Sequence, residues 1–172
     1  MSNYSYQQIE RLPVSHAENR RKIFNILIAD DDTNIASNLQ SLLNLRGHIV
    51  NIVDDGIGCI SKCKNTENFF DIVFLDYHMD GLDGAQVAEI VKDDGKKTLV
   101  FAYTGDNSDK ALNEFKIAGM DGAIIKPIDI KGIDMLMNKL ENSSHIDKTT
   151  INSLSRKTER SILIFDEINT QS

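Results

Sequence analysis

An alternation between short apolar runs and longer stretches of helical periodicity constrains the fold of this chain more than any other feature. It repeats five times between residues 23 and 142, with apolar runs at 25–29, 48–53, 71–76, 99–103 and 122–125. Each run has the length of a buried strand, and the stretch after the first one places apolar residues at helical spacing, namely Ile35, Leu39, Leu42 and Leu43. Strands that alternate with helices build a parallel sheet with helices on both faces. The sequence therefore predicts a doubly wound α/β domain with five parallel strands.

Two segments lie outside the predicted domain. Because 172 residues leave little room for a second domain, we interpret 1–22 as an N-terminal extension or linker and 143–172 as a C-terminal tail. The tail carries apolar residues at near-helical spacing, namely Ile151, Leu154, Ile162, Phe165 and Ile168. This pattern fits an amphipathic helix that docks on the domain or pairs with a second copy in a homodimer, and it also fits a strand at 161–165 or a partly disordered tail.

The charge distribution excludes some classes of partner. Residues 23–142 hold 11 basic and 20 acidic residues, a net charge of −9 within a chain whose net charge is −7. Such a surface repels phosphate backbones, so we predict no direct binding of nucleic acid. Clustered carboxylates favour a hard cation instead.

The apolar composition and the cysteines indicate a compartment. No apolar run approaches the roughly 20 residues that cross a bilayer, and the first residues lack the apolar block of a secretory signal. We therefore predict no membrane insertion. The two cysteines, Cys59 and Cys63, have no second pair with which to form a zinc site, and their spacing on a helix favours packing. We expect a cytoplasmic protein.

Polar side chains that carry chemistry follow the predicted strands. Asp30, Asp31 and Asp32 follow the first strand. Asp76 stands at the end of the third strand, Thr104 comes after the fourth, and Lys126 comes after the fifth. In an open parallel sheet, ligands bind outside the carboxyl ends of the strands. We therefore expect these side chains to form one site.

The residue types in this site favour magnesium and phosphoryl chemistry. Neighbouring carboxylates repel one another unless a cation or a proton removes the repulsion, and Mg²⁺ is usually held by one or two carboxylates together with phosphate oxygens. We predict Asp31 and Asp76 as direct ligands and Asp30 as a ligand through water. Asp76 can then attack phosphorus with its other oxygen, while Lys126 and Thr104 neutralise charge on the phosphoryl oxygens.

These motifs, in this order and at these spacings, resemble the receiver domain of two-component response regulators. The resemblance covers 23–142 and rests on 26–32, 71–84, 103–105 and Lys126-Pro127. It implies a flavodoxin-like sheet of strand order 2-1-3-4-5. It also implies that Asp76 is the phosphoacceptor, that Asp30 and Asp31 form the acidic pair for Mg²⁺ with the backbone carbonyl of His78 as a further ligand, and that Thr104 and Lys126 hold the phosphoryl group.

The resemblance also implies partners and a function. A histidine kinase or a histidine phosphotransfer protein would phosphorylate Asp76, and a downstream protein target would bind in response. Such a domain is not an enzyme beyond catalysing its own phosphorylation and dephosphorylation. Two alternatives remain: the receiver piece of a hybrid histidine kinase, and a haloacid-dehalogenase-type phosphatase with a nucleophile on the first strand. The second is disfavoured because Thr33 lies three residues after Asp30, whereas that pattern places the threonine four residues after the nucleophile.

Four further positions bear on the kinetics and the switch. His78, two residues after the acceptor, and Asp106, two residues after Thr104, are predicted to set the lifetime of the phosphoryl group. The family often has an aromatic residue three positions before the lysine, where this chain has Ala123. Tyr103, beside Thr104, is our hypothesis for a substitute ring.

Overall fold

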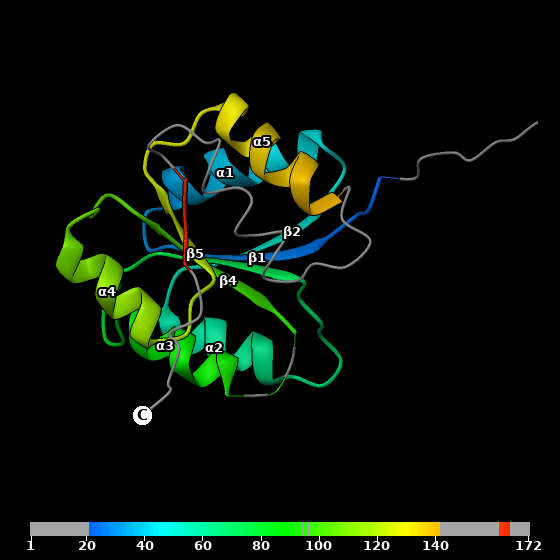
Figure 1. Ribbon diagram of the computed structural model, residues 1–172. Coiled ribbons are helices and arrows are strands. Elements are labelled where there is room, and N and C mark those ends of the chain that lie inside the picture. The colour runs from blue at the N-terminus through cyan, green and yellow to red at the C-terminus, as the bar shows by residue number, and fades with distance from the viewer. Residues whose placement is uncertain (1–20, 94, 96, 142–161, 166–172) are drawn as a thin grey trace, which may run out of the picture.

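The computed structural model describes residues 21–93, 95, 97–141 and 162–165 (Figure 1). The strands among these residues are β1 (Asn25–Ala29), β2 (Ile49–Val53), β3 (Ile72–Leu75), β4 (Leu99–Thr104), β5 (Gly122–Ile125) and β6 (Ile162–Ile164). The helices are α1 (Thr33–Leu45), α2 (Gly56–Lys64), α3 (Gly84–Lys92), α4 (Asp109–Ile117) and α5 (Ile130–Glu141). Strands and helices alternate as far as α5, as the apolar pattern predicts.

The strands form one sheet of order β2-β1-β3-β4-β5-β6. The first five strands are parallel, so the predicted order 2-1-3-4-5 is confirmed. β6 is an addition that the predicted five-stranded sheet lacks, and it pairs antiparallel with the outer edge of β5. The structure therefore contains the expected doubly wound fold extended by one short strand.

Helices cover both faces of the sheet. α1 and α5 lie on one face, and α2, α3 and α4 lie on the other (Figure 1). Two apolar clusters fill the layers, one around Phe24, Phe74 and Phe101 and the other around Val73 and Phe115. Every residue of β3 and β4 is buried. Strands covered on both faces are apolar along their whole length, which explains why these runs show no alternation with polar residues.

Local signals in the sequence set the helix boundaries. Asp32 is the N-cap of α1, because its side chain accepts hydrogen bonds from the backbone N–H groups of Asn34 (2.9 Å) and Ile35 (3.2 Å). α2 runs from Gly56 to Lys64, and its N-cap is Asp55, whose side chain accepts the backbone N–H of Gly58. Cys59 and Cys63 are both buried in the apolar cluster between α2 and the sheet, and they form no disulfide, which agrees with a packing role.

The described part of the tail is a strand. Of the alternatives that the sequence leaves open, the structure shows extended backbone at Ile162–Ile164. The other apolar residues of the predicted tail helix, Ile151, Leu154 and Ile168, lie outside the described residues, as does most of the N-terminal extension. Within the described ranges, every helix is too short or too polar to cross a membrane.

Candidate functional site: an acidic pocket at the carboxyl ends of the strands

The register of the parallel strands brings the predicted site residues to one edge of the sheet. Ala29 pairs with Leu75, so Asp30 and Asp76 follow two strands that end side by side. Thr104, the last residue of β4, pairs with Ile125 of β5, and Lys126 comes next. The backbone N–H of Lys126 donates to the carbonyl oxygen of Thr104 (2.8 Å). The prediction that these residues meet at one edge therefore agrees with the structure.

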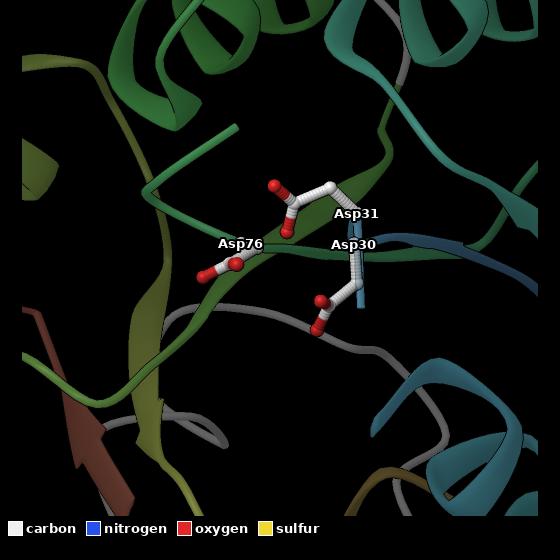
Figure 2. Close-up of side chains that lie close together, drawn as sticks. All are labelled: Asp30, Asp31 and Asp76. Carbon is white, nitrogen blue, oxygen red and sulfur yellow. The ribbon is translucent and has the colours of Figure 1, made fainter. Parts of the chain in front are cut away.

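Three carboxylates form the floor of the pocket. Each of Asp30, Asp31 and Asp76 offers an oxygen that lies within 4.8 Å of the oxygens offered by the other two, and Figure 2 shows the three side chains grouped at the ends of two strands. Asp30 and Asp76 are buried, whereas Asp31 is exposed. Carboxylate oxygens at this spacing are hard ligands that suit a divalent cation such as Mg²⁺. The donor set therefore fits a metal ion that approaches from the side of Asp31.

Lys126 supplies the positive charge of the pocket. Its ammonium nitrogen lies 2.7 Å from Oδ2 of Asp30 and 3.1 Å from Oδ2 of Asp76, and its side chain is only 14% exposed. It also lies 5.1 Å from the centre of the Tyr103 ring. One ammonium group thus faces two buried carboxylates, which leaves a net negative charge for a cation to neutralise.

Backbone groups orient the two buried carboxylates. Oδ1 of Asp30 accepts the N–H of Asp32 (3.0 Å), and Oδ1 of Asp76 accepts the N–H of Tyr77 (2.8 Å). These bonds leave Oδ2 of each carboxylate directed toward Lys126. A Cβ atom on Gly84 would lie 2.4 Å from the backbone oxygen of Asp76, so the start of α3 packs directly against the residue after β3. The position of Asp76 is therefore fixed on several sides.

Burial raises the pKa of Asp30 above its ordinary value of 3.8, and the neighbouring Asp76 carboxylate adds to the rise. The hydrogen bond and the charge of Lys126 oppose this effect without cancelling it. A carboxyl group that binds its proton more tightly in the folded chain stabilises the fold below its unfolded pKa. That contribution is lost as the pH rises through the folded pKa.

We therefore expect Asp30→Asn to become increasingly more stable than wild type as the pH rises, with the difference levelling off near neutral pH. The expected gain without metal ions is about 0.5–2 kcal/mol, typical for a stabilising replacement at a functional site. Urea unfolding of both chains in EDTA across the acid range measures this difference. A difference in the free energy of unfolding that shrinks with rising pH would contradict the raised pKa of Asp30.

Thr104 and Asp106 lie at the carboxyl end of β4, at the same edge of the sheet as Lys126. Thr104 is fully buried, and its Oγ1 accepts the N–H of Asp106 (3.1 Å). Asp106 in turn accepts the N–H of Ser108 (2.8 Å), which is the N-cap of α4. These Ser108 contacts lower the pKa of Asp106, and the nearby His78 also contributes. His78 is exposed in the loop after Asp76, so the two residues predicted to tune the lifetime lie close enough to interact electrostatically.

Tyr103 and Ala123 lie on opposite faces of the sheet. Tyr103 belongs to the apolar cluster beneath α1 and α5, and burial raises its pKa to about 12. Ala123 belongs to the cluster on the side of α2, α3 and α4. The Tyr103 ring therefore does not occupy the space beside Ala123, although it contacts the ammonium of Lys126.

Tyr77 makes a contact that the sequence does not reveal. Its hydroxyl donates to the carboxylate of Glu114 on α4, and its ring meets Phe115 edge-on with centroids 5.0 Å apart. The residue directly after Asp76 thus joins the acidic pocket to α4. Tyr77 and Glu114 are 37 residues apart. No spacing rule links two residues at that separation, so only the fold brings them together.

The comparison with protein families agrees with this geometry. Residues 26–138 match the model of the response regulator receiver domain. The chain belongs to this family. The match spans β1 to the greater part of α5 and includes each of the pocket residues Asp30, Asp31, Asp76, Thr104 and Lys126. The protein therefore contains a receiver domain of the kind found in two-component response regulators.

Curated relatives contain the same domain within much longer proteins. The chain is 28% identical over 116 residues to the transcription factor SKN7 of Candida albicans, an alignment that covers 67% of this chain and 20% of that protein. It is 30% identical over 132 residues to the CAI-1 autoinducer sensor kinase/phosphatase CqsS of Vibrio cholerae, with coverage of 75% and 18%. It is 34% identical over 122 residues to ethylene receptor 2 of Oryza sativa subsp. japonica, with coverage of 69% and 16%. The chain thus spans about a fifth or less of these relatives.

Solved structures show the same fold. The receiver domain of the Francisella response regulator 1452 superposes with a TM-score of 0.62 at 24% identity, covering 69% of this chain and 96% of that one. The receiver domain of Saccharomyces cerevisiae Ssk1, solved together with the histidine phosphotransfer protein Ypd1, gives a TM-score of 0.65 at 17% identity, with coverage of 75% and 98%. The flavodoxin-like fold predicted from the sequence is confirmed.

Proposed function

We propose that this chain is a phosphoacceptor that switches partner binding through Mg²⁺-dependent phosphorylation of Asp76. The observation that supports this most is the position of the Asp76 carboxylate. It lies within metal-binding distance of Asp30 and Asp31 and 3.1 Å from the ammonium of Lys126. An anionic nucleophile beside a cation site and a fixed ammonium group is suited to receive a phosphoryl group.

The proposed metal ligands are the carboxylates of Asp31 and Asp76, with Asp30 acting through water and the backbone carbonyl of His78 as a further ligand. When bound, Mg²⁺ would supply positive charge to the oxygens of the phosphoryl group. Asp76 attacks phosphorus with one carboxylate oxygen, so an O–P bond forms as the bond between phosphorus and the donor breaks. The donor leaves with the electron pair of that bond, and the product on the chain is an acyl phosphate.

Lys126 and Thr104 hold the transferred group in this proposal. The Lys126 ammonium already faces Oδ2 of Asp76, so it can pair with a phosphoryl oxygen through a small movement. The Thr104 hydroxyl accepts a hydrogen bond from Asp106, which leaves its own proton free to be donated to a second phosphoryl oxygen. Thr104 is the last residue of β4 and Lys126 directly follows the neighbouring strand β5, so both side chains lie at the same edge of the sheet.

The proposed phosphodonor is a histidine kinase or a histidine phosphotransfer protein, and the proposed reader is a downstream protein target. The structural similarity to a receiver solved with the phosphotransfer protein Ypd1 supports the first of these partners. A phosphoryl group adds about −1.5 to −2 charges at neutral pH, which changes a surface enough to bias partner binding. The acidic domain gives no reason to invoke direct contact with nucleic acid.

A turnover assay separates this proposal from a phosphatase. In a phosphatase of the haloacid-dehalogenase type the nucleophile would be Asp30, and a threonine would lie four residues later, where this chain has Asn34. Incubation with a generic phosphomonoester and Mg²⁺ is expected to give no sustained release of phosphate, because the chain catalyses only its own phosphorylation and dephosphorylation. Release of many equivalents per chain would refute the proposal.

We expect His78 and Asp106 to set the lifetime of the phosphoryl group. Both lie at the mouth of the pocket, on the loops after β3 and β4, where a water molecule approaches phosphorus. His78→Ala and Asp106→Ala are therefore expected to change the rate at which the loaded chain loses phosphate. The measurement is intact mass against time after removal of the donor. Unchanged rates in both variants would remove this role.

A further inference from the structure

The outer edge of β5 is occupied by a segment from the C-terminal tail. β6 pairs antiparallel with β5 in the register Gly122↔Ile164, Ala123↔Leu163 and Ile124↔Ile162. Beyond the strand, the N–H of Phe165 donates to the carbonyl oxygen of Asp121 (3.1 Å). An uncovered edge strand presents unpaired backbone groups on which another strand can add. The segment 162–165 therefore fills the open edge of the sheet, as Figure 1 shows beside β5.

Side chains of the segment anchor it on both faces of the sheet. Ile162 is buried in the cluster beneath α1 and α5, whereas Leu163 and Phe165 pack with the cluster on the side of α4. Phe165 is only 8% exposed, and the ammonium of Lys116 on α4 lies 5.4 Å from the centre of its ring. This alternation is that of a strand with both faces covered, so the pairing is specific in register and in side-chain packing.

The remainder of the domain is complete without this segment. β6 lies at the end of the sheet and has β5 as its strand neighbour, so its departure leaves β1 to β5 paired as before. The family match ends at residue 138, before the segment begins. About 20 residues, 142–161, link α5 to β6. Because these residues keep the segment on the same chain, its binding to β5 is an intramolecular event.

We propose that residues 162–165 are an intramolecular ligand that occupies the β5 edge and the neighbouring surface of α4. A protein partner that adds an extended strand to β5 must displace this segment first. The occupant is the segment of the same chain, anchored by Phe165 and Ile162.

The test uses the full chain and a labelled peptide of residues 160–167. Phe165→Asp places a charge in the apolar cluster and is expected to release the segment. Phe69→Asp is the matched control, because Phe69 is 52% exposed and lies outside β5 and β6. The peptide is expected to bind Phe165→Asp at least about tenfold more tightly than it binds wild type or Phe69→Asp. In the latter two chains, only the fraction of molecules whose own segment has left the β5 edge can bind the peptide, which lowers the apparent affinity. A peptide with an N-methyl group at Phe165 loses the donor to Asp121 and is expected to bind more weakly.

Amide hydrogen exchange provides the second measurement on the same chains. Phe165→Asp is expected to lose protection in β5 and at 162–165 while β1 and β3 keep wild-type protection, which also shows that the variant is folded. Failure of the peptide to bind this folded variant would overturn the proposal. Unchanged amide protection of β5 in Phe165→Asp would also overturn it. So would a wild-type chain in which the amides of β6 exchange only when those of β1 and β3 exchange. A wild-type dimer that Phe165→Asp dissociates would show that a second copy supplies the strand, and would overturn occupancy by the same chain.

Discussion

Lys126→Met is expected to slow the labelling of Asp76 by a small phosphodonor by about 10²–10³-fold, the usual cost of removing one preorganised group that stabilises transition-state charge. Methionine keeps an unbranched side chain of similar length but removes the ammonium that faces Asp30 and Asp76 at 2.7 and 3.1 Å. The rate of labelling at saturating Mg²⁺, followed by intact mass, measures the effect.

The control for this variant is Lys131→Met, which removes one positive charge from an exposed position of α5. It is expected to label at the wild-type rate because Lys131 lies outside the acidic pocket. Thermal unfolding of Lys126→Met checks that the chain remains folded, since two buried carboxylates lose their counter-charge. If folded Lys126→Met labels as fast as Lys131→Met, Lys126 does not hold the phosphoryl group.

Asp31→Asn is expected to raise the Mg²⁺ concentration for half-maximal labelling by at least about tenfold, because even outer-shell changes at metal sites typically cost 10–100-fold in affinity. Asp31 is the exposed member of the three carboxylates, so its replacement has little effect on folding. The labelling rate as a function of Mg²⁺ concentration gives the shift, and EDTA is expected to abolish labelling of both chains.

Asp32→Asn is the matched control for the metal site. It removes the same charge one residue further along, and asparagine keeps the N-cap that Asp32 provides to the N–H groups of Asn34 and Ile35. We expect this variant to need wild-type amounts of Mg²⁺. An equal shift in both variants would show that general electrostatics, rather than ligation by Asp31, controls the affinity.

The arrangement of the site could be predicted because it depends on strand ends. The apolar runs of β1, β3, β4 and β5 are followed by polar or charged residues or end on one. Parallel strands bring their carboxyl ends to one edge of the sheet. Asp30, Asp76 and Lys126 are therefore brought together by topology alone, as their ion pairs show. The N-cap of α1 at Asp32 was predictable for a different reason, because its capping hydrogen bonds join residues that are close in the sequence.

Other features depend on contacts between distant residues. Residues 162–165 are too few for periodicity to distinguish a strand from a helix, and the open edge of β5 decides that they are extended. The hydroxyl of Tyr77 meets Glu114 only because α4 packs beside the loop after β3. The substitute ring proposed at Tyr103 lies across the sheet from Ala123, because residues on neighbouring strands alternate between faces according to a register that the sequence alone does not give.

Intact mass after incubation with a small phosphodonor tests the acceptor role of Asp76 most directly. With Mg²⁺, wild type is expected to gain the mass of one phosphoryl group, and Asp76→Asn is expected to gain none while remaining folded. The carboxylate that lies beside Asp30, Asp31 and Lys126 would then be the acceptor. Labelling of folded Asp76→Asn to the same extent, or no labelling of wild type at any Mg²⁺ concentration, would contradict the account.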